Sequence, residues 1–290
     1  MSSHAISTFI SNWSIEVVPT ENFSCAQLSG EAPVGTSVYV TSIPGQGTGN
    51  LLRTSKTLKQ AGFDPIPHIT ARSIRSVDQL RSLLSSLEEL SIQKILLLGG
   101  DTPDVAGPFA SSLEVLESGI LEGYSLKQIG FATYPERHKY ISSEVLERQL
   151  SSKIKVASEL GFQSSLVTQL CFDATATVRH IERLRARGIQ IPVHVGVAGP
   201  TSWTTMLKFA AICGVAASAY SLKSNASRVR QLASGFDSTD QIADFAVFSF
   251  SNSMAGKMAP HFFTFGGTKK TIAWINALLR ENSKFSEGVE

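Results

Sequence analysis

Cysteine is scarce in this 290-residue sequence, and so are the features that mark secreted, membrane or nucleic-acid-binding proteins. The three cysteines, Cys25, Cys171 and Cys213, are far apart and form no CxxC pair. This argues against a disulfide scaffold or a zinc ribbon and fits a reducing cytoplasm. Lys and Arg (26) barely outnumber Asp and Glu (24), which leaves a net charge of +2. A nucleic-acid-binding protein would instead carry clustered basic residues.

Long hydrophobic runs are also missing. The longest apolar-looking run, from Phe209 to Tyr220, contains Gly and Ser and is shorter than the ~20 residues of a membrane span. The sequence starts Met-Ser-Ser-His-Ala, without the basic start and apolar stretch of a signal peptide. We therefore expect a cytoplasmic protein with no membrane or nucleic-acid partner. No group of His, Cys and carboxylates has metal-ligand spacing, so no metal is expected, and there is no nucleophile elbow or Walker loop.

The rest of the sequence alternates short strand-like runs with helical stretches. Several runs are apolar throughout, as expected for parallel strands buried on both faces. The eight runs are Trp13–Pro19, Ser37–Pro44, Pro65–Thr70, Lys94–Asp101, Gln128–Glu136, Ser165–Asp173, Pro192–Pro200 and Pro260–Gly267. Apolar residues three and four apart predict helices over Asn50–Ala61, Val77–Leu90, Glu144–Leu160, Ala174–Arg187 and Thr204–Cys213.

This alternation, without a linker, predicts a single domain over residues 1–290, folded as an α/β (β/α)8 TIM barrel. The gap from Thr201 to Ala259 is about twice the usual unit and is expected to hold extra helices before the last strand. Ser76 and Asp173 directly precede helical stretches and fit N-cap positions. The alternative is an open doubly wound sheet, which is disfavoured because no GxGxxG turn follows the first strand.

Polar residues gather where the predicted strands end, which is where ligands bind in α/β barrels. They are Glu16, Thr41, His68, Asp101, Tyr134, Glu136, His138, Gln169 and Asp173. A carboxylate within Ile-Glu-Val-Val and an amide within Val-Thr-Gln-Leu are costly to bury without partners. The plainer interpretations are an outward-facing Glu16, an ordinary strand residue at Thr41, a capping Asp101, and core histidines at His68 and His194. The residues alone indicate a barrel enzyme with an acid, amides and hydroxyls around one mouth.

Seven segments resemble motifs of the methylenetetrahydrofolate reductase family, in the family's order, from residue 14 to about 266. The first strand, Ser-Ile-Glu-Val-Val-Pro from residue 14, resembles S-F-E-F-F-P, and the second ends in the family's V-T at 40–41. Pro-His-Ile-Thr from 67, Leu-Gly-Gly-Asp from 98 and Tyr-Pro-Glu-Arg-His from 134 are similar to P-H-L-T, L-R-G-D and Y-P-E-x-H. Thr-Gln-Leu-Cys-Phe-Asp from 168 and His-Phe-Phe-Thr from 261 resemble T-Q-x-x-F-D and H-F-Y-T.

The resemblance implies FAD lying across the carboxyl ends of the strands. By position, FAD would contact Thr41, His68, Asp101, Phe109, Ala110, Ala132, Tyr134 and His138. A lysine in the helix before the sixth strand would reach the phosphates; Lys153 fits the spacing best, and Lys155 is the alternative. The folate would stack on the flavin, with Gln169 and Asp101 at its pterin and Phe209 against the rest of the ligand.

The activity that the resemblance implies is reduction of 5,10-methylenetetrahydrofolate to 5-methyltetrahydrofolate, in one-carbon metabolism and methionine biosynthesis. NADH or NADPH would reduce FAD, and the folate would then take hydride in the vacated site. Its closed ring must first be protonated and opened to an iminium, which needs a carboxylic acid whose pKa is raised by burial. Glu16 is the candidate general acid, while Asp101 would tune the charge around pterin and flavin. Hydride comes from the flavin, so no protein nucleophile is needed.

The sequence departs from the family at Gly99, where the usual arginine is missing, and at Asp104, Lys139 and Thr205. The lost arginine leaves FAD affinity and nicotinamide preference open. One alternative is the same barrel oxidising methyltetrahydrofolate in one-carbon catabolism, or working without tightly bound FAD. Another is a non-redox folate-binding methyl-transfer barrel, whereas a pure interaction protein is disfavoured. The oligomeric state also stays open, with a homo-oligomer among the options.

Overall fold

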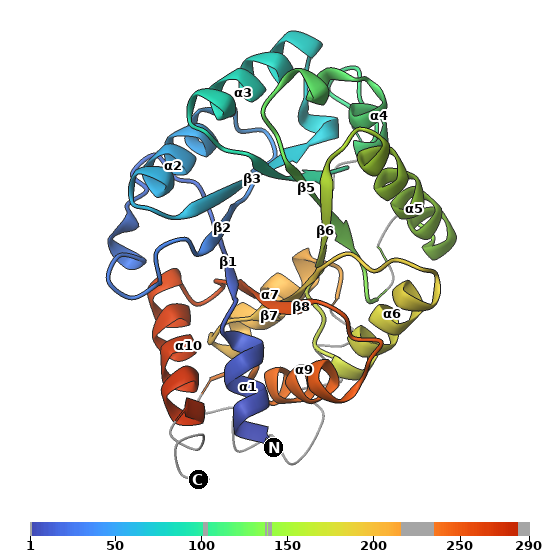
Figure 1. The fold of residues 1–290 in the computed structure, drawn as a ribbon. Coiled ribbons are helices and arrows are strands. Elements are labelled where there is room, and N and C mark those ends of the chain that lie inside the picture. Colours follow the sequence, from blue (N-terminus) through green and yellow to red (C-terminus); the bar gives the residue numbers. More distant parts are fainter. Residues whose placement is uncertain (1, 101–103, 137, 139–140, 216–234, 284–290) are drawn as a thin grey trace.

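The computed structural model describes residues 2–100, 104–136, 138, 141–215 and 235–283. Its parallel strands pair in chain order, and the last pairs with the first, so the sheet closes into the predicted barrel. Figure 1 shows the strands as a central ring with helices around it. The strands are β1 (Ser14–Val17), β2 (Ser37–Val40), β3 (Asp64–Thr70), β4 (Lys94–Leu98), β5 (Gln128–Thr133), β6 (Gln163–Thr168), β7 (Val193–Ala198) and β8 (Met258–Phe263).

Helices cover the outside of the barrel. Those after the first strand are α2 (Gly49–Gln60), α3 (Val77–Glu89), α4 (Ser112–Glu117), α5 (Ser143–Glu159), α6 (Ala174–Ala186), α7 (Trp203–Ile212), α9 (Thr239–Ser251) and α10 (Thr268–Ser283). The N-terminal helix α1 (Ser2–Ile10) lies between α9 and α10 (Figure 1). Short 3-10 turns occupy Cys25–Gln27, Ala71–Ser73 and Ile120–Gly123. Within the described part of the chain, no helix has both the length and the apolar composition to cross a membrane.

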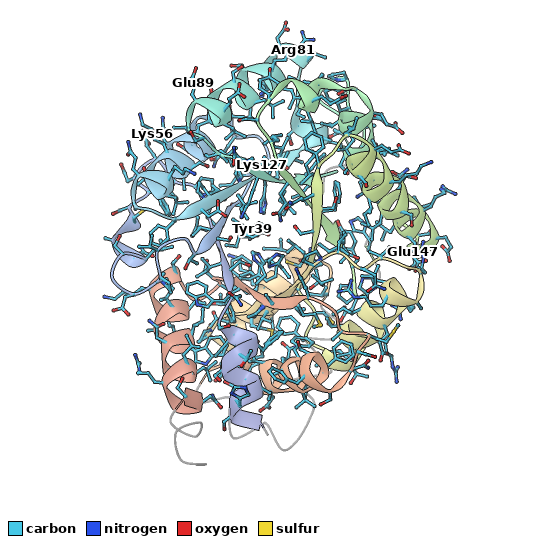
Figure 2. All side chains as sticks on the ribbon, viewed as in Figure 1. Tyr39, Lys56, Arg81, Glu89, Lys127 and Glu147 are labelled. Atoms are coloured by element: carbon cyan, nitrogen blue, oxygen red, sulfur yellow. The ribbon has the colours of Figure 1, made fainter. Side chains whose placement is uncertain are left out.

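Side-chain alternation along the strands divides the core in two. Residues that face the helices, such as Ile15, Val17 and Phe131, belong to the main core between barrel and helices. Inside the barrel, a smaller group packs together, consisting of Tyr39, Ile66, Leu96 and Val167. Figure 2 shows Tyr39 within the ring of strands. The barrel is therefore filled by side chains, and its ligand-binding capacity lies at the strand ends.

The predicted strands are confirmed in place, although most predicted runs extend past the observed strand into the following loop. The N-caps are confirmed as well, because the Ser76 side chain accepts from Gln79 N–H and the Asp173 side chain from Ala176 N–H. The extra helical structure before β8 is present as α7 and α9. Three helices were not predicted: α4 is only six residues long, and α1 and α10 lie outside the eight strand runs on which the prediction was based.

Gly196 in β7 stands where the barrel wall leaves no room for a side chain. A Cβ there would lie 2.6 Å from the Thr168 carbonyl oxygen and 2.7 Å from the ring of Phe263. We expect Gly196→Ala to lower the free energy of unfolding by about 1–3 kcal/mol, as at other overpacked core sites, measured by urea denaturation. Gly99→Ala is the control, because a Cβ at Gly99 meets no atom of the described chain within 4 Å. Equal stability of the two variants would contradict this prediction.

Candidate active site

Glu16 lies near the end of β1, and its carboxyl group points toward His68 and His261 on the barrel strands rather than toward bulk water. Its backbone carbonyl accepts a hydrogen bond from Thr264 Oγ1 (2.9 Å), which ties the end of β1 to the segment after β8. The side chain is 21% exposed, so it is largely buried. The alternative interpretation, in which the Glu16 side chain points outward into solvent, is therefore wrong.

Two buried histidines flank the Glu16 carboxyl group. His68 on β3 places Nε2 3.7 Å from Oε2, and His261 on β8 places Nε2 3.8 Å from the same oxygen. Neither Nε2 atom has a hydrogen-bond partner among the described residues. The Tyr39 ring contacts both imidazoles edge-on, with centroids 6.1 and 4.6 Å apart. We refer to Glu16, His68, His261, Tyr39 and Ser14 as the Glu16 cluster.

Burial shifts the ionisable groups of the Glu16 cluster toward their uncharged forms. It raises the pKa of Glu16 above 4.5, although the neighbouring His68 opposes the shift. Burial also lowers the pKa of His68 to about 4, against the attraction of Glu16, and that of His261 to about 3. Both imidazoles are therefore neutral at pH 7, and the 3.7 Å contact between His68 and Glu16 is not an ion pair. A carboxyl group without a cation beside it, in an apolar barrel, favours its protonated form.

Ser14 sets the orientation of the His261 ring. Ser14 Oγ lies 3.0 Å from His261 Nδ1 and 3.5 Å from the carbonyl oxygen of Pro260. When the Ser14 hydroxyl donates to the Pro260 carbonyl oxygen, His261 Nδ1–H donates to Ser14, and Nε2 then carries a lone pair toward Glu16. That tautomer is the one that suits a protonated Glu16.

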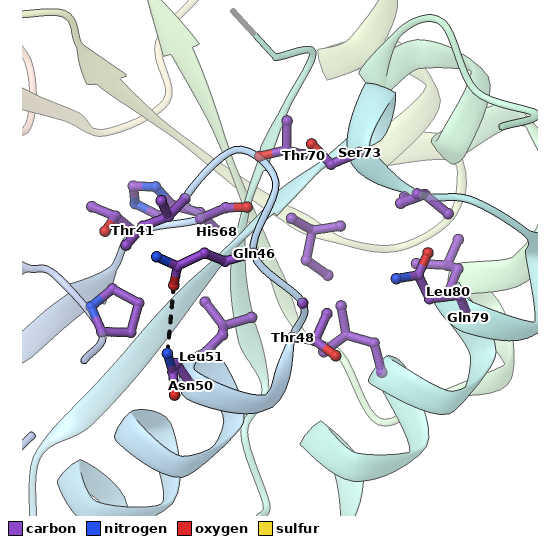
Figure 3. A pocket seen from close by; sticks show the side chains of 17 residues that line it. Thr41, Gln46, Thr48, Asn50, Leu51, His68, Thr70, Ser73, Gln79 and Leu80 are labelled. Carbon is purple, nitrogen blue, oxygen red and sulfur yellow. Dashed lines mark hydrogen bonds between the residues drawn. The ribbon is translucent and has the colours of Figure 1, made fainter. Parts of the chain in front are cut away.

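Thr41 and His68 also line a small cavity between the ends of β2 and β3, with a volume of about 50 Å³. Figure 3 shows Gln46 beside both residues, hydrogen-bonded to Asn50 (3.4 Å). Thr41 N–H donates to Val17 O (3.1 Å), but Thr41 Oγ1 is buried and has no partner in the described chain. Buried hydroxyls are normally hydrogen-bonded, so this one is available to a ligand.

A much larger cavity of about 660 Å³ opens at the ends of β4 and β5. Five of the residues predicted to contact FAD line it, namely Ala110, Ala132, Tyr134, His138 and Lys153. They come from the segment after β4, from β5 and its following loop, and from α5. The rings of Tyr134 and His138 meet edge-on at 4.8 Å. The volume is within the range of about 300–1,000 Å³ that is typical of small-molecule sites.

Two lysines of α5 differ sharply in their surroundings. Lys153 lies on the wall of the large cavity, with Nζ 5.4 Å from the centre of the Phe131 ring. Burial lowers its pKa to about 8, and no carboxylate of the described residues forms an ion pair with it. Lys155 is 75% exposed and pairs with Glu159 at 3.8 Å. Lys153 is therefore the lysine placed to meet an anionic ligand.

Gln169 and Phe209, two of the residues predicted to bind folate, do not line the large cavity. Gln169, directly after β6, donates its backbone N–H to Thr133 O (2.7 Å), and its Oε1 accepts from Leu170 N–H (2.9 Å). Phe209 of α7 stacks on Phe265, with centroids 4.2 Å apart and planes 10° from parallel.

A run of aromatic rings joins Phe209 to the Glu16 cluster. Phe265 lies parallel to Phe263 at 5.6 Å, and Phe263 meets the His261 ring edge-on at 5.2 Å. Each step is within the usual range for aromatic pairs, about 4.5–7 Å, or slightly closer. An aromatic ligand that contacted Phe209 would thus be close to a rigid, apolar wall leading to the acid.

Two of the residues predicted to contact FAD are not seen on a cavity wall, for different reasons. Asp101 is outside the described residues, so its predicted contacts with flavin and folate are not seen. Phe109 is 5% exposed and packs in the main core, leaving its neighbour Ala110 on the wall of the large cavity. No group of three or more His, Cys, Asp and Glu side chains suited to a metal ion occurs in the described part of the chain.

Three contributors to the site were not predicted as site residues: Ser14, His261 and Arg72. Ser14 and His261 are register partners across the β1–β8 seam, a pairing that exists only once the barrel is closed. Arg72, in the turn after β3, lines the large cavity. The available signals were a serine and a histidine within apolar strand runs and an arginine just past the Pro-His-Ile-Thr segment.

The chain matches the sequence model of the family described as methylenetetrahydrofolate reductase over residues 28–231. Among curated relatives, the 5,10-methylenetetrahydrofolate reductase of Pectobacterium carotovorum subsp. carotovorum is 28% identical over 190 residues. The protein of the same name from Escherichia coli (strain K12) is 27% identical over 184 residues. Each alignment covers 61% of this chain and 59% of the relative, so the chain spans about three fifths of these relatives' length.

A solved structure has the same fold, with a TM-score of 0.58 at 11% sequence identity. The similarity covers 97% of this chain and 100% of the other one. That protein is described as an uncharacterized protein from Clostridium thermocellum that binds two copies of 5-methyl-5,6,7,8-tetrahydrofolic acid. At this identity, the comparison shows the barrel fold that both chains share.

Proposed function

Because the chain belongs to the methylenetetrahydrofolate reductase family, we propose that it reduces 5,10-methylenetetrahydrofolate to 5-methyltetrahydrofolate, with FAD and either NADH or NADPH. One observation carries the proposal: the Glu16 carboxyl group is held between two neutral histidines at the barrel mouth and biased toward its protonated form. The folate-reducing reaction needs such an acid before hydride can add.

Glu16 is the general acid of this proposal. It donates its proton to the N10 side of the bound folate, which opens the five-membered ring and leaves an iminium at the one-carbon unit. Because His68 and His261 are neutral, they do not place a positive charge beside the developing iminium. The carboxylate that remains after proton transfer instead stabilises that charge. General acid catalysis of this kind contributes about 10²–10⁴-fold in rate.

The described residues fit FAD. The large cavity offers Lys153 for the phosphates and the Tyr134 and His138 rings for the nucleotide, and Thr41 Oγ1 is an unpaired buried group beside His68. When bound, FAD supplies the hydride that reduces the iminium. Gln169 and Phe209 would hold the pterin and the remainder of the folate, and Asp101 keeps its proposed role as a nearby charge.

The test is an anaerobic pair of half-reactions on the purified chain. Yellow protein should lose its colour when NADH or NADPH is added and regain it when 5,10-methylenetetrahydrofolate follows. A colourless protein that still oxidises nicotinamide nucleotide would contradict the flavin-dependent mechanism. Folate binding without any electron transfer would contradict the reductase assignment and favour a non-redox folate barrel.

Substituting the cavity lysine should weaken FAD binding. In Lys153→Met, loss of the cation on the cavity wall is expected to raise the Kd for FAD roughly 10-fold or more, as for a charged hydrogen bond. Flavin released on dilution, followed by fluorescence, measures this. Lys155→Met is the matched control and should bind FAD like the parent, because Lys155 points to solvent. If Lys155→Met weakens FAD binding and Lys153→Met does not, Lys155 is the phosphate ligand.

A further inference from the structure

The geometry points to Arg72 as a phosphate-binding residue of the large cavity, taking the place of the arginine that the related motif carries at position 99. The ligand class is the diphosphate portion of a dinucleotide. This inference rests on the proposed function, because FAD is the dinucleotide that the cavity is proposed to hold. Arg72 comes from the turn after β3, whereas Gly99 directly follows β4.

The backbone of Arg72 is fixed on both sides. Its N–H donates to Gly99 O (3.1 Å), and its carbonyl oxygen accepts from Ala106 N–H (2.9 Å). These two backbone hydrogen bonds hold Arg72 between the end of β4 and the segment that leads to α4. They also fix where the Arg72 side chain starts from the backbone.

The side chain of Arg72 is oriented by a further bond. Its Nε–H donates to the carbonyl oxygen of Ala110 (2.9 Å), and both residues line the large cavity. Because a guanidinium group is planar and rigid, this bond at Nε restrains the orientation of the whole fork. Arginine in a fixed plane recognises phosphate oxygens through two parallel N–H bonds.

The two glycines after β4 are consistent with this placement. At Gly100, φ is +114° and a Cβ would lie 2.8 Å from Thr70 Cγ2, so glycine is needed there, and Arg72 Cβ lies at ordinary contact distance (3.4 Å) from the same position. At Gly99, a Cβ would meet no described atom within 4 Å, and the residue lines the same cavity. The wall of the large cavity therefore has room for a side chain at position 99, where the related motif carries arginine. Arg72 reaches the same cavity from the turn after β3, the neighbouring strand.

The charges on the cavity wall favour an anion. The described cationic side chains that line it are Arg72, Lys153 and Arg183, and the acidic ones are Glu136 and Glu147. Glu147 is paired with Arg187 (2.6 Å), and Glu136 Oε1 accepts from the Cys171 thiol (3.3 Å). Arg72 and Lys153 approach the cavity from β3 and α5, so a diphosphate between them would meet a cation on each side.

Calorimetric titration of the full chain, freed of flavin, tests the inference with three probes: FAD, ADP and riboflavin, which has no phosphate. Arg72→Leu should weaken binding of FAD and ADP roughly 10- to 100-fold, with riboflavin affinity changed less than about twofold. Arg75→Leu is the matched control, since Arg75 is exposed and off the cavity wall, and it should bind all three probes like the parent. Arg72→Gln, which keeps an N–H for Ala110 O, should show the same loss if Arg72→Leu melts at a lower temperature.

A second-site change makes the test sharper. Adding Gly99→Arg to Arg72→Leu restores a guanidinium from the open position on β4, and we expect it to recover most of the lost affinity for FAD and ADP. Recovery with Gly99→Arg but not with Gly99→Leu shows that charge, not bulk, is restored. A merely structural role for Arg72 predicts no recovery.

The outcomes separate this inference from the proposed function. If the parent binds FAD and Arg72→Leu binds it equally well, the inference is overturned while the flavin-dependent function stands. If the parent binds ADP through Arg72 but does not bind FAD, the inference stands and the flavin proposal fails. If the parent binds neither FAD nor ADP, the inference is overturned, because the cavity then takes no phosphate ligand.

Discussion

Glu16→Gln is expected to lower the rate of 5,10-methylenetetrahydrofolate reduction by about 10²–10⁴-fold, the usual contribution of a general acid. Glutamine keeps the size and one carbonyl oxygen of the side chain but has no acidic proton for the folate. The variant should retain FAD, and NADH or NADPH should still reduce that FAD at the parent rate, because this half-reaction does not involve the acid. Stopped-flow absorbance separates the two half-reactions.

Two controls show whether the loss at Glu16 comes from proton transfer. Glu21→Gln removes an exposed carboxyl group a few residues downstream and should leave both half-reactions unchanged. Folate binding to the reduced Glu16→Gln protein should persist, so that the effect appears in the rate of the step rather than in binding. If Glu16→Gln reduces the folate at the parent rate, Glu16 is not the acid.

The second large effect concerns acid stability and comes from four histidines that are held neutral. Burial lowers the pKa of His68, His180 and His194 to about 4, and that of His261 to about 3. A lowered folded-state pKa contributes stability above the unfolded value of 6.5 that is lost as pH falls toward 4. Between pH 6.5 and 5, each histidine is therefore expected to cost about 2 kcal/mol, since one pKa unit is 1.36 kcal/mol.

Glu16 works in the opposite direction but does not cancel this loss. Its raised pKa means that its contribution is fullest below 4.5 and declines as pH rises through its folded value. One carboxyl group opposes four imidazoles, so the net result is a steep fall in stability on acidification. Denaturant titrations at pH 7.5 and pH 5 should show a decrease of several kcal/mol, a large share of the 5–15 kcal/mol typical of a domain.

A single substitution identifies the cause of this acid lability. His194 lies inside the barrel beside Tyr39, and its Nδ1 is buried without a partner among the residues that the structure describes. His194→Leu removes one titrating group and should reduce the loss between pH 6.5 and 5 by about 2 kcal/mol, with little change at pH 7.5. If the slope of stability against pH is the same in parent and variant, the histidines are not responsible.

The order of strands and helices along the chain could be predicted from the sequence because each element depends on a local residue pattern. Runs such as Lys94–Leu98 are short, apolar and followed by a turn, and the helices carry apolar residues at helical spacing. Ser76 and Asp173 act through bonds to residues three positions away, which sequence spacing captures directly. Helix α10 carries the same local pattern, with Ile272, Ile275 and Leu278 buried at helical spacing, but it follows the last strand run, and α1 precedes the first and packs on α9 and α10.

The site was predictable only in part, because its contacts cross the barrel. Glu16 stands out as a charge in an apolar strand, but its partners His68 and His261 are 52 and 245 residues away in sequence. Spacing favoured Lys153 and left Lys155 as the alternative, and the two differ in burial, since Lys153 lines the large cavity and Lys155 is exposed. Arg72 was missed for a similar reason, since its role depends on how the turn after β3 lies over the glycines after β4.

The most direct test of the account is the ionisation state of the Glu16 carboxyl group itself. Infrared difference spectra of the parent and Glu16→Gln, recorded across a pH series, isolate the stretching band of that one protonated carboxyl group. The account predicts that the band persists as pH rises well past 4.5, the ordinary value for glutamic acid. A band that disappears at or below pH 4.5 would mean that Glu16 is an ordinary carboxylate and cannot protonate the folate.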